Sequence, residues 1–537
     1  MGIPSYYKKL IDTVPGLISK GHPSGNIQWL FMDFNCLIYH CLHREDTPPY
    51  PGNSNKDEWE AQFLDCIVKY CLKVIKEVDP KKGVFIAIDG VVPMAKMRQQ
   101  RLRRFKSIWL SEHPDTDVST GPTWDRNSIT PGTNFMKKLR IRLETMIAKH
   151  GKKSWALSSS DEPGEGEHKI ISEWRSGHFD GDFAVYGLDA DLIVLSILGR
   201  ECGELNNNIW LFREEINAGK ITYDSLGEEV FEWFSINALR DWLSVEFRSE
   251  PIKQKTFILN YCFAMSVLGN DFLPSSLGLK IRDDGHSELL DIIQTLTSKG
   301  VALINPETLK ISFEDVKTLF TVLSTEEEVR IQKYIHKKQM MARNMGQNLE
   351  GAEFKLGDNN WPLSHIEEEV LINHKQLVPN WKEKYMTHFF NGFSFNKEDI
   401  HRVCNEYLYG IQWIWAYYTG LMKDVCFNWF YPFNLPPLWI WLKDYLNDTQ
   451  TLPSFPNKVL LKANEIEPFE QLALVLPLES WSLIPDGPVK MLPKLAPQFY
   501  PSAFTFESTG KRFFWECESM IPLPSILEVK EIIRHYT

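Results

Sequence analysis

Short apolar runs alternate with longer amphipathic stretches from residue 28 to about 200, and this alternation is typical of βα units. Four runs are short enough to be buried strands, at residues 29–32, 84–88, 155–157 and 184–188. Residues 225–335 are predicted to be mostly helical, because apolar residues recur at spacings of three and four over 231–247 and 287–323. The pattern predicts an α/β chain with a mostly parallel central sheet, helical additions and an aromatic-rich C-terminal region.

The best candidate for a linker is the segment 344–361, which is rich in Asn and Gly and poor in apolar residues. We therefore expect an N-terminal region at 1–343 and a second region at 362–537 that packs on it. The most membrane-like stretch, 407–442, is split by Lys423 and Asp424 and broken by three prolines. It is predicted to be core, so no membrane span is expected.

The composition is that of an ordinary globular protein, with 43% hydrophobic and 24% charged residues. The net charge of −11 and the pI near 5.8 argue against a surface coated in basic charge, so any nucleic-acid site must be local. The nine cysteines include no CxxC pair, which disfavours zinc knuckles and a disulfide framework. Without a secretory or nuclear signal, a reduced intracellular protein acting in the cytoplasm is the default expectation.

Acidic residues follow each of the four predicted strands, where ligands bind in open α/β sheets. They are Asp33, Asp89, Glu165, Glu167, Asp189 and Asp191, and Asp271 in a later GNDFLP loop is a seventh candidate. Singly, each could be a helix cap or turn residue, but those positions accept Asn, Ser and Thr equally well. Carboxylates after all four strands favour a metal site instead. Oxygen ligands without clustered His or Cys favour two Mg²⁺ ions, with Mn²⁺ as an alternative, and hydrolytic phosphoryl transfer.

A basic helix is predicted directly after Asp89, beginning at Pro93. Its polar stripe of Lys96, Gln100, Arg103 and Arg104 falls within about 100° of the helix circumference. Alone, this stripe would be a solvated helix face. Beside a metal site, three cations and an amide indicate a phosphate pocket.

The chain resembles the Xrn-type family of 5′-to-3′ exoribonucleases. The resemblance rests on these segments, which occur in the family's order: MGIPSYY, FMDFNCLIYH, IAIDGVVPMAKMRQQRLRRF, PGEGEHKI, YGLDADLIVL, LGNDFLP, EYLYGIQWIWAYYTG, NWFYPFNLPP, EPFEQLALVLP and TGKRFFWECESMIPLP. It covers nearly the whole chain.

The resemblance implies a nuclease core related to flap endonucleases and PIN domains over 1–343, in which the seven acids bind two Mg²⁺ ions. The stripe on the basic helix would hold the 5′-monophosphate of single-stranded RNA, and hydrolysis would release nucleoside monophosphates processively. Tyr39, at a position where the family usually has His, would stack on the terminal base, with His40 beside it. Trp429 would be the opposite stacking partner, although a core tryptophan is the alternative.

Two other functions share this pattern of residues. One is an inactive RNA-binding scaffold of the same fold, and the other is a flap endonuclease or 5′ exonuclease acting on DNA. All seven acids are present, and the Lys/Gln/Arg stripe and the aromatic second region favour the RNA exonuclease. We expect a monomer without a small-molecule cofactor; the sequence indicates no protein partner.

Overall fold

The computed structural model describes residues 3, 5–23, 25–113, 122–152, 154–177, 179–187, 189–203, 207–217, 220–348, 363, 366–420, 425–454 and 461–536, with backbone alone at 344–348. The helices are α1 (Tyr6–Thr13), α2 (Asn35–Leu42), α3 (Lys56–Val78), α4 (Met94–Glu112), α5 (Asn134–His150), α6 (Gly166–Ser176), α7 (Asp191–Gly203), α8 (Ile236–Leu243), α9 (Pro251–Ala264), α10 (Gly285–Ser298), α11 (Phe313–Thr325), α12 (Glu327–Asn348), α13 (Trp381–Phe389), α14 (Lys397–Thr419), α15 (Trp439–Thr449), α16 (Pro468–Val475), α17 (Leu492–Leu495) and α18 (Ile526–His535). The strands are β1 (Ile18–Ser19), β2 (Ile27–Asp33), β3 (Gly83–Ala87), β4 (Trp155–Ser158), β5 (Asp182–Tyr186), β6 (Ile209–Glu214), β7 (Ile216–Asn217), β8 (Lys220–Ile221), β9 (Phe231–Ser235), β10 (Ile372–Asn373), β11 (Gln376–Leu377), β12 (Thr505–Glu507) and β13 (Glu518–Met520).

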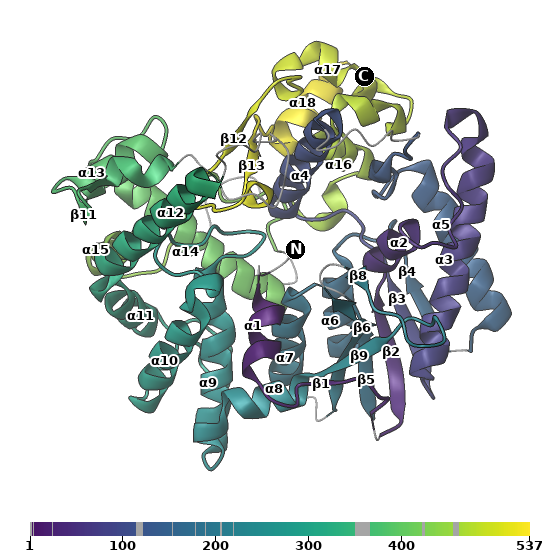
Figure 1. Cartoon of the computed structure of the whole chain (residues 1–537), viewed down its shortest axis with the longest axis horizontal. Helices are drawn as coiled ribbons and strands as arrows, with labels where there is room; N and C mark the ends of the chain where they lie inside the picture. The colour runs from purple at the N-terminus through teal and green to yellow at the C-terminus, as the bar shows by residue number, and fades with distance from the viewer. Residues whose placement is uncertain are drawn as a thin grey trace.

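A seven-stranded sheet forms the centre of the N-terminal region, in the order β1-β9-β6-β5-β2-β3-β4 (Figure 1). The five strands from β6 to β4 are parallel, and β9 and β1 add two antiparallel neighbours at one edge. Because the parallel strands point the same way, the acids that follow β2, β3, β4 and β5 meet at one edge of the sheet. The predicted fold class, with its mostly parallel sheet and helical additions, is confirmed.

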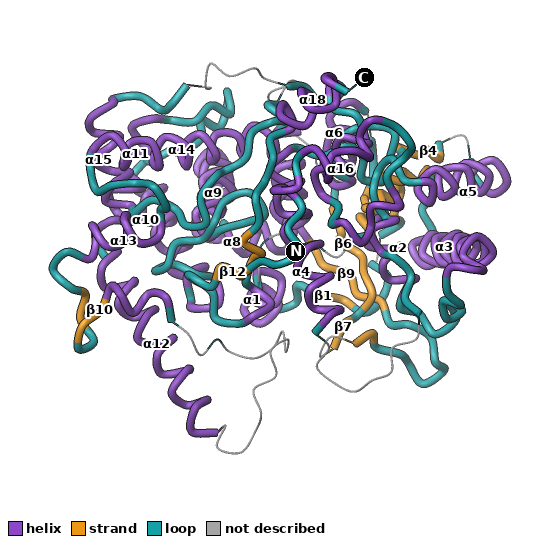
Figure 2. Tube along the Cα trace, turned by 90° about the horizontal axis from the view of Figure 1, so that it is seen from above, coloured by secondary structure: helices purple, strands orange, loops and turns teal. Residues whose placement is uncertain are grey.

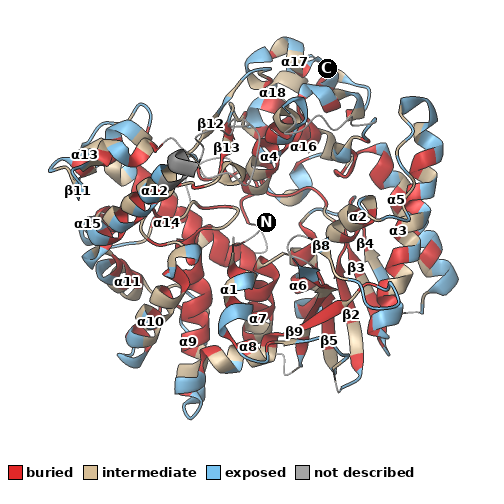
Figure 3. Ribbon diagram, in the orientation of Figure 1, coloured by how far each residue is buried: buried red, intermediate tan, exposed pale blue. Residues whose placement is uncertain are grey.

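Both faces of the sheet are buried, and alternate residues of β2 belong to different hydrophobic clusters. Leu30 and Met32 pack with α2, α3 and α5, whereas Phe31 packs with α6 and α7 on the opposite face. This alternation follows from the two-residue period of a strand, and it explains the continuous apolar run in the sequence. Figure 3 shows buried residues along the whole of α7, which lies between the sheet and the other helices.

The second region packs closely on the first. The cluster that contains α7 also contains residues of α9, α14 and α15, so sheet and helical lobe share one core. Figure 2 shows this arrangement from above, with α9, α11, α14 and α15 on one side of α1 and α4 and the sheet on the other. A smaller cluster joins the beginning of α4 to α16 and α18. Helix α4 therefore lies between the two regions.

Two boundaries predicted from the sequence need correction. Helix α12 continues through Asn348, so the linker expected at 344–361 begins inside a helix, and 349–361 lie outside the described residues. The helical pattern expected over 231–247 begins instead with strand β9, because Phe231 and Trp233 pack on one sheet face and Phe234 on the other. Within the described residues, none of the helices has the length and apolar character needed to cross a membrane.

Candidate active site

The acids predicted from the sequence gather at the carboxyl edge of the parallel strands. Asp33 ends β2, Asp89 follows β3, Glu165 and Glu167 flank the first residue of α6, and Asp191 begins α7. Asp189 lies between β5 and α7, and Asp271 comes from the loop after α9. The side chains of Asp33, Glu165, Glu167 and Asp191 are buried.

Lys96 of α4 binds two of these acids. Its Nζ lies 2.7 Å from Glu165 Oε2 and 2.9 Å from Asp271 Oδ2. Burial would lower the pKa of Lys96, but the carboxylates of Asp271 and Glu165 raise it well above its ordinary value. Burial would likewise raise the pKa of Asp271, and the Lys96 ammonium reverses that shift and lowers it. Lys96 therefore stays charged. It joins α4 to the acidic edge, meaning the seven predicted acids at the carboxyl ends of the parallel strands.

The other carboxylates hold more negative charge than Lys96 neutralises. Burial raises the pKa of Asp33 and of Glu167 well above the ordinary range, and repulsion from neighbouring acids adds to both shifts. Burial and the nearby Asp189 raise the pKa of Asp191 to about 7. The buried Oδ1 of Asp191 also accepts no hydrogen bond from any described residue. Buried, mutually repelling oxygen ligands of this kind fit a hard divalent cation.

Gly166 brings four of the acids together. Its backbone N–H donates to Asp89 Oδ1 at 2.7 Å, and Glu165 and Glu167 are its neighbours in the chain. A Cβ at this position would lie 2.5 Å from Asp33 Oδ1. Glycine is therefore required here, because any side chain would push Asp33 away from the other carboxylates.

Three further residues support the acids, and the sequence analysis did not single them out. Asn35 donates to Asp89 Oδ2 at 3.0 Å, and Tyr417 of α14 donates to Glu165 Oε1 at 2.9 Å. The His168 ring stacks on that of Tyr417 at 3.7 Å, and its ligand atoms lie within 4.8 Å of those of Glu165 and Glu167. A histidine thus joins a cluster that was expected to contain oxygen ligands alone. Asn35 could have been noticed in FMDFN, but Tyr417 gave no local signal.

The predicted stripe on α4 divides between two environments. Lys96 reaches the acids, as described above, whereas Gln100 and Arg104 are buried farther along the helix and Arg103 is exposed. Arg104 donates to Thr130 Oγ1 at 2.7 Å, and Gln100 Oε1 is buried without a hydrogen-bond partner among the described residues. Burial lowers the pKa of Arg104 to about 10, which leaves it a cation. An anion bound along this face would meet two cations and an amide.

The three predicted stacking residues occupy different surroundings. Tyr39 is half-buried on α2, close enough to Arg104 for its hydroxyl to affect the pKa of that guanidinium. The His40 ring turns into the protein, where Nε2 lies 3.1 Å from Glu229 Oε1 and the ring packs on Tyr70 at 4.6 Å. Because these contacts hold the His40 ring inside the protein, Tyr39 is better placed than His40 to stack on a base.

Trp429 is 7% exposed and packs against Trp413 and Tyr409 of α14, with its Nε1 donating to Glu406 at 3.3 Å. These contacts are those of a core tryptophan. Its stacking role stays a prediction.

A buried arginine, Arg101, is one of the residues that fix helix α4 to the second region. The Arg101 guanidinium donates to the backbone carbonyls of Leu474 at 2.7 Å and Pro522 at 3.1 Å, and also to that of Phe499. Burial lowers the pKa of Arg101 to about 10. The sequence placed Arg101 in the basic run without giving it a role, and the structure shows that it holds the stripe in place.

Comparisons with known proteins identify the family that the chain is similar to. A family model described as "XRN 5′-3′ exonuclease N-terminus" matches residues 1–215, and one described as "Xrn1 helical domain" matches 364–530. Human "5′-3′ exoribonuclease 1" is 28% identical over all of this chain and 34% of its own length. "5′-3′ exoribonuclease 2" of Candida glabrata is 30% identical over 61% of this chain and 38% of its own length. The chain thus spans little more than a third of these curated relatives.

Among solved structures, human GEN1 in complex with Holliday junction DNA covers 67% of this chain and 83% of its own chain. The sequence identity is 11% and the TM-score is 0.29. A likeness this slight carries no argument about function.

Proposed function

Because the chain belongs to the Xrn-type family of 5′-to-3′ exoribonucleases, we propose that it hydrolyses single-stranded RNA from a 5′-monophosphate end and releases nucleoside 5′-monophosphates processively. The observation that carries this proposal is the gathering of buried carboxylates beside Lys96 of α4. The acidic edge provides a place for hydrolysis, and the adjoining cationic face provides a place for a terminal phosphate.

The seven acids Asp33, Asp89, Glu165, Glu167, Asp189, Asp191 and Asp271 would hold two Mg²⁺ ions, for which Mn²⁺ could substitute. Such ions activate water and stabilise the charge that develops on a phosphodiester during hydrolysis. The chain's own residues orient these ligands: Asn35 and the Gly166 N–H fix Asp89, and Tyr417 fixes Glu165. Lys96 would remain charged beside the scissile phosphate and attract it.

The terminal phosphate would bind along Gln100, Arg103 and Arg104. Gln100 and the cationic Arg104 are already buried, and a terminal monophosphate would accept hydrogen bonds from the Gln100 amide N–H₂ and the Arg104 guanidinium. A cap or triphosphate adds bulk and charge on the outer side of this phosphate. Decapped RNA is therefore the proposed substrate, and RNA decay by a cytoplasmic monomer the proposed setting.

One assay tests the proposal. A 5′-monophosphate RNA, its 5′-hydroxyl and capped forms, and the matching DNA are incubated with Mg²⁺, and the products are resolved over time. We expect rapid appearance of mononucleotides from the monophosphate RNA alone. Binding without cleavage would instead identify an RNA-binding scaffold, and preferred cleavage of DNA would identify a DNA nuclease. Chelation by EDTA should stop the reaction, and added Mg²⁺ or Mn²⁺ should restore it.

A further inference from the structure

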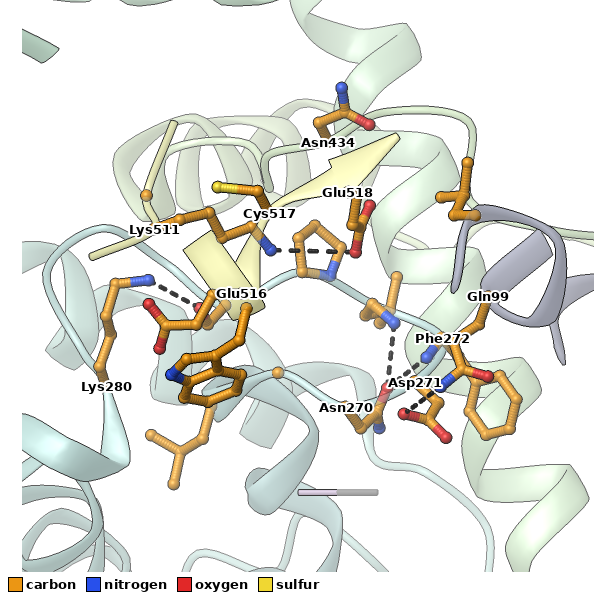
Figure 4. A pocket seen from close by; sticks show the side chains of 18 of the residues that line it. Gln99, Asn270, Asp271, Phe272, Lys280, Asn434, Lys511, Glu516, Cys517 and Glu518 are labelled. Carbon is orange, nitrogen blue, oxygen red and sulfur yellow. Dashed lines mark hydrogen bonds and ion pairs between the residues drawn. The ribbon is translucent and has the colours of Figure 1, made fainter. Parts of the chain in front are cut away.

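A cavity of about 240 Å³ opens beside Asp271 and extends away from the acidic edge. It is lined by one side of α4, by the loop that carries Asp271, by η5 (Ile281–Asp283) and by residues 510–518 near the C-terminus. Figure 4 shows Asp271 and Gln99 at one end of the cavity and Lys280 at the other, with Glu516, Cys517 and Glu518 between them. The cavity therefore begins at an acid of the candidate active site.

The cavity and the two buried residues of the phosphate stripe, Gln100 and Arg104, lie on opposite sides of Lys96, whereas Arg103 of the stripe also lines the cavity. At about 100° per residue, Gln100 and Arg104 lie about 40° and 80° from Lys96 in one direction around α4. Gln99 and Lys106 of the cavity lie about 60° and 80° away in the other direction. A strand with its 5′ phosphate on the stripe and its scissile phosphate at the acids would thus continue toward the cavity.

The cavity has more cations than carboxylates to neutralise them. The cations are Arg98, Arg103, Lys106, Lys280, Arg282, Lys511 and Arg512, and the carboxylates are Asp271, Asp283, Glu516 and Glu518. Four of the cations pair with carboxylates of the cavity: Arg282 with Glu516 at 3.0 Å, Arg98 and Lys511 with Glu518 at 3.5 and 3.8 Å, and Arg512 with Asp283. Arg103, Lys106 and Lys280 form no ion pair with a described carboxylate.

Of these three cations, Lys106 is buried and Lys280 is half-buried, which makes the missing counter-charge costly. Lys280 Nζ donates to Ser275 Oγ at 2.9 Å and lies over the Tyr334 ring at 5.2 Å. Burial and the nearby Lys511 lower the pKa of Lys280 to about 7. Lys106 Nζ donates to the carbonyls of Cys517, at 3.0 Å, and Phe514, and burial lowers its pKa to about 8. An anion entering the cavity would supply the negative counter-charge that the ammonium groups of Lys280 and Lys106 lack.

An aromatic face at the cavity wall narrows the choice of anion. Trp515 is half-buried, and the Arg282 guanidinium lies 5.2 Å from its ring centroid. Sites for single-stranded nucleic acids combine cations for the phosphates with aromatic rings on which bases stack. The lining therefore favours a nucleotide over inorganic phosphate.

We propose that this cavity is a second phosphate subsite, which binds a phosphate of the RNA strand on the 3′ side of the scissile bond, with Lys280 and Lys106 facing that phosphate and Trp515 facing an attached base. The inference rests on the proposed function, because it assumes that the strand is cleaved at the acidic edge. It adds a grip on the body of the strand that the 5′-phosphate stripe does not provide.

The test compares RNAs that can and cannot reach the cavity. A 5′-monophosphorylated dinucleotide has only the terminal and scissile phosphates, whereas an octanucleotide continues beyond them. Binding of each is measured with Mg²⁺ at pH 6, where Lys280 is mostly protonated, in an Asp191→Asn background that prevents cleavage. Lys280→Met removes the unpaired charge, and Trp515→Leu removes the aromatic face. Lys299→Met is the matched control, because Lys299 is exposed and follows α10 at the end remote from η5.

We expect Lys280→Met to weaken octanucleotide binding by about tenfold, as for loss of a charged hydrogen bond. The slope of log affinity against log salt should also fall by about 0.7, the value for one phosphate contact on a single strand. Trp515→Leu should weaken the octanucleotide as well, and the dinucleotide should bind all variants equally.

Equal losses for both RNAs, an unchanged octanucleotide affinity, or the same loss in Lys299→Met would each overturn the subsite. If Lys280→Met weakened the binding of free nucleoside monophosphate and of neither RNA, the subsite would also be overturned. The cavity would then be assigned to the released product. Because binding is measured without turnover, an absence of cleavage by the unmodified protein would count against the proposed function only.

Discussion

Replacing Gly166 with alanine tests whether the close approach at the start of α6 is what assembles the acidic edge. The added Cβ would lie 2.5 Å from Asp33 Oδ1 and 3.1 Å from the Ala87 carbonyl, whereas ordinary contact begins at 3.4 Å. The Asp33 carboxylate must therefore move by about 0.9 Å. Such a shift at a reacting centre costs about a hundredfold in rate, so we expect kcat/KM on monophosphate RNA to fall by about that factor.

The fold should survive Gly166→Ala. Overpacking lowers the free energy of unfolding by roughly 1–3 kcal/mol, and alanine in place of glycine in a helix raises it by about 0.5–1 kcal/mol. The melting temperature should therefore fall by a few degrees at most, while activity falls far more. Gly21→Ala is the matched control, because Gly21 is exposed and a Cβ there meets nothing within 4 Å. Activity within threefold of the unmodified enzyme would refute the role assigned to this contact.

Three other substitutions test separate parts of the structure. Asp191→Asn should abolish cleavage, and retained turnover in Mg²⁺ would contradict the assignment of Asp191 as a metal ligand. The same change should raise the melting temperature of the metal-free protein near pH 8, because burial raises the pKa of this carboxyl to about 7 and the amide removes a buried charge. Arg103→Ala should reduce the preference for monophosphate over hydroxyl ends by roughly tenfold, measured as a ratio of kcat/KM values, and an unchanged ratio would remove Arg103 from the phosphate site. Burial raises the pKa of Glu327 from 4.5 to about 7, so stability should fall as pH rises through that interval, and urea midpoints for Glu327→Gln should lose this dependence. The same slope in both proteins would show that another group causes it.

Local patterns predicted the parts of the fold that depend on neighbouring residues. The four parallel strands before the acids were found because each is a short apolar run, and α4 because good helix formers follow Pro93. Strand β9 was mistaken for helix, since its apolar residues are buried on both faces of the sheet and lack the alternation of a half-buried strand. The end of α12 was missed because Asn and Gly weaken a helical pattern without always ending a helix.

The candidate site was predictable where one residue type recurs at strand ends, and unpredictable where distant segments meet. The acids follow strands, so the sheet topology alone brings them together. Tyr417 lies 252 residues from Glu165, and the Gly166 N–H lies 77 residues from Asp89. No local pattern encodes such pairs. The separate surroundings of His40 and Tyr39 follow from the direction in which α2 faces the sheet. The identities of two neighbouring residues do not show which of them will face the interior.

The contacts of Arg101 have a consequence for the order in which the protein becomes active. Its three carbonyl acceptors lie 373, 398 and 421 residues farther along the chain, the last being Pro522. During synthesis the sheet emerges before these three segments, so α4 lacks the contacts of Arg101 until the last of them has been made. A nascent chain would therefore carry all seven acids before the Arg101 contacts hold the phosphate stripe in place. We expect the messenger RNA being translated to be safe from its own product until the segment around Pro522 has been made.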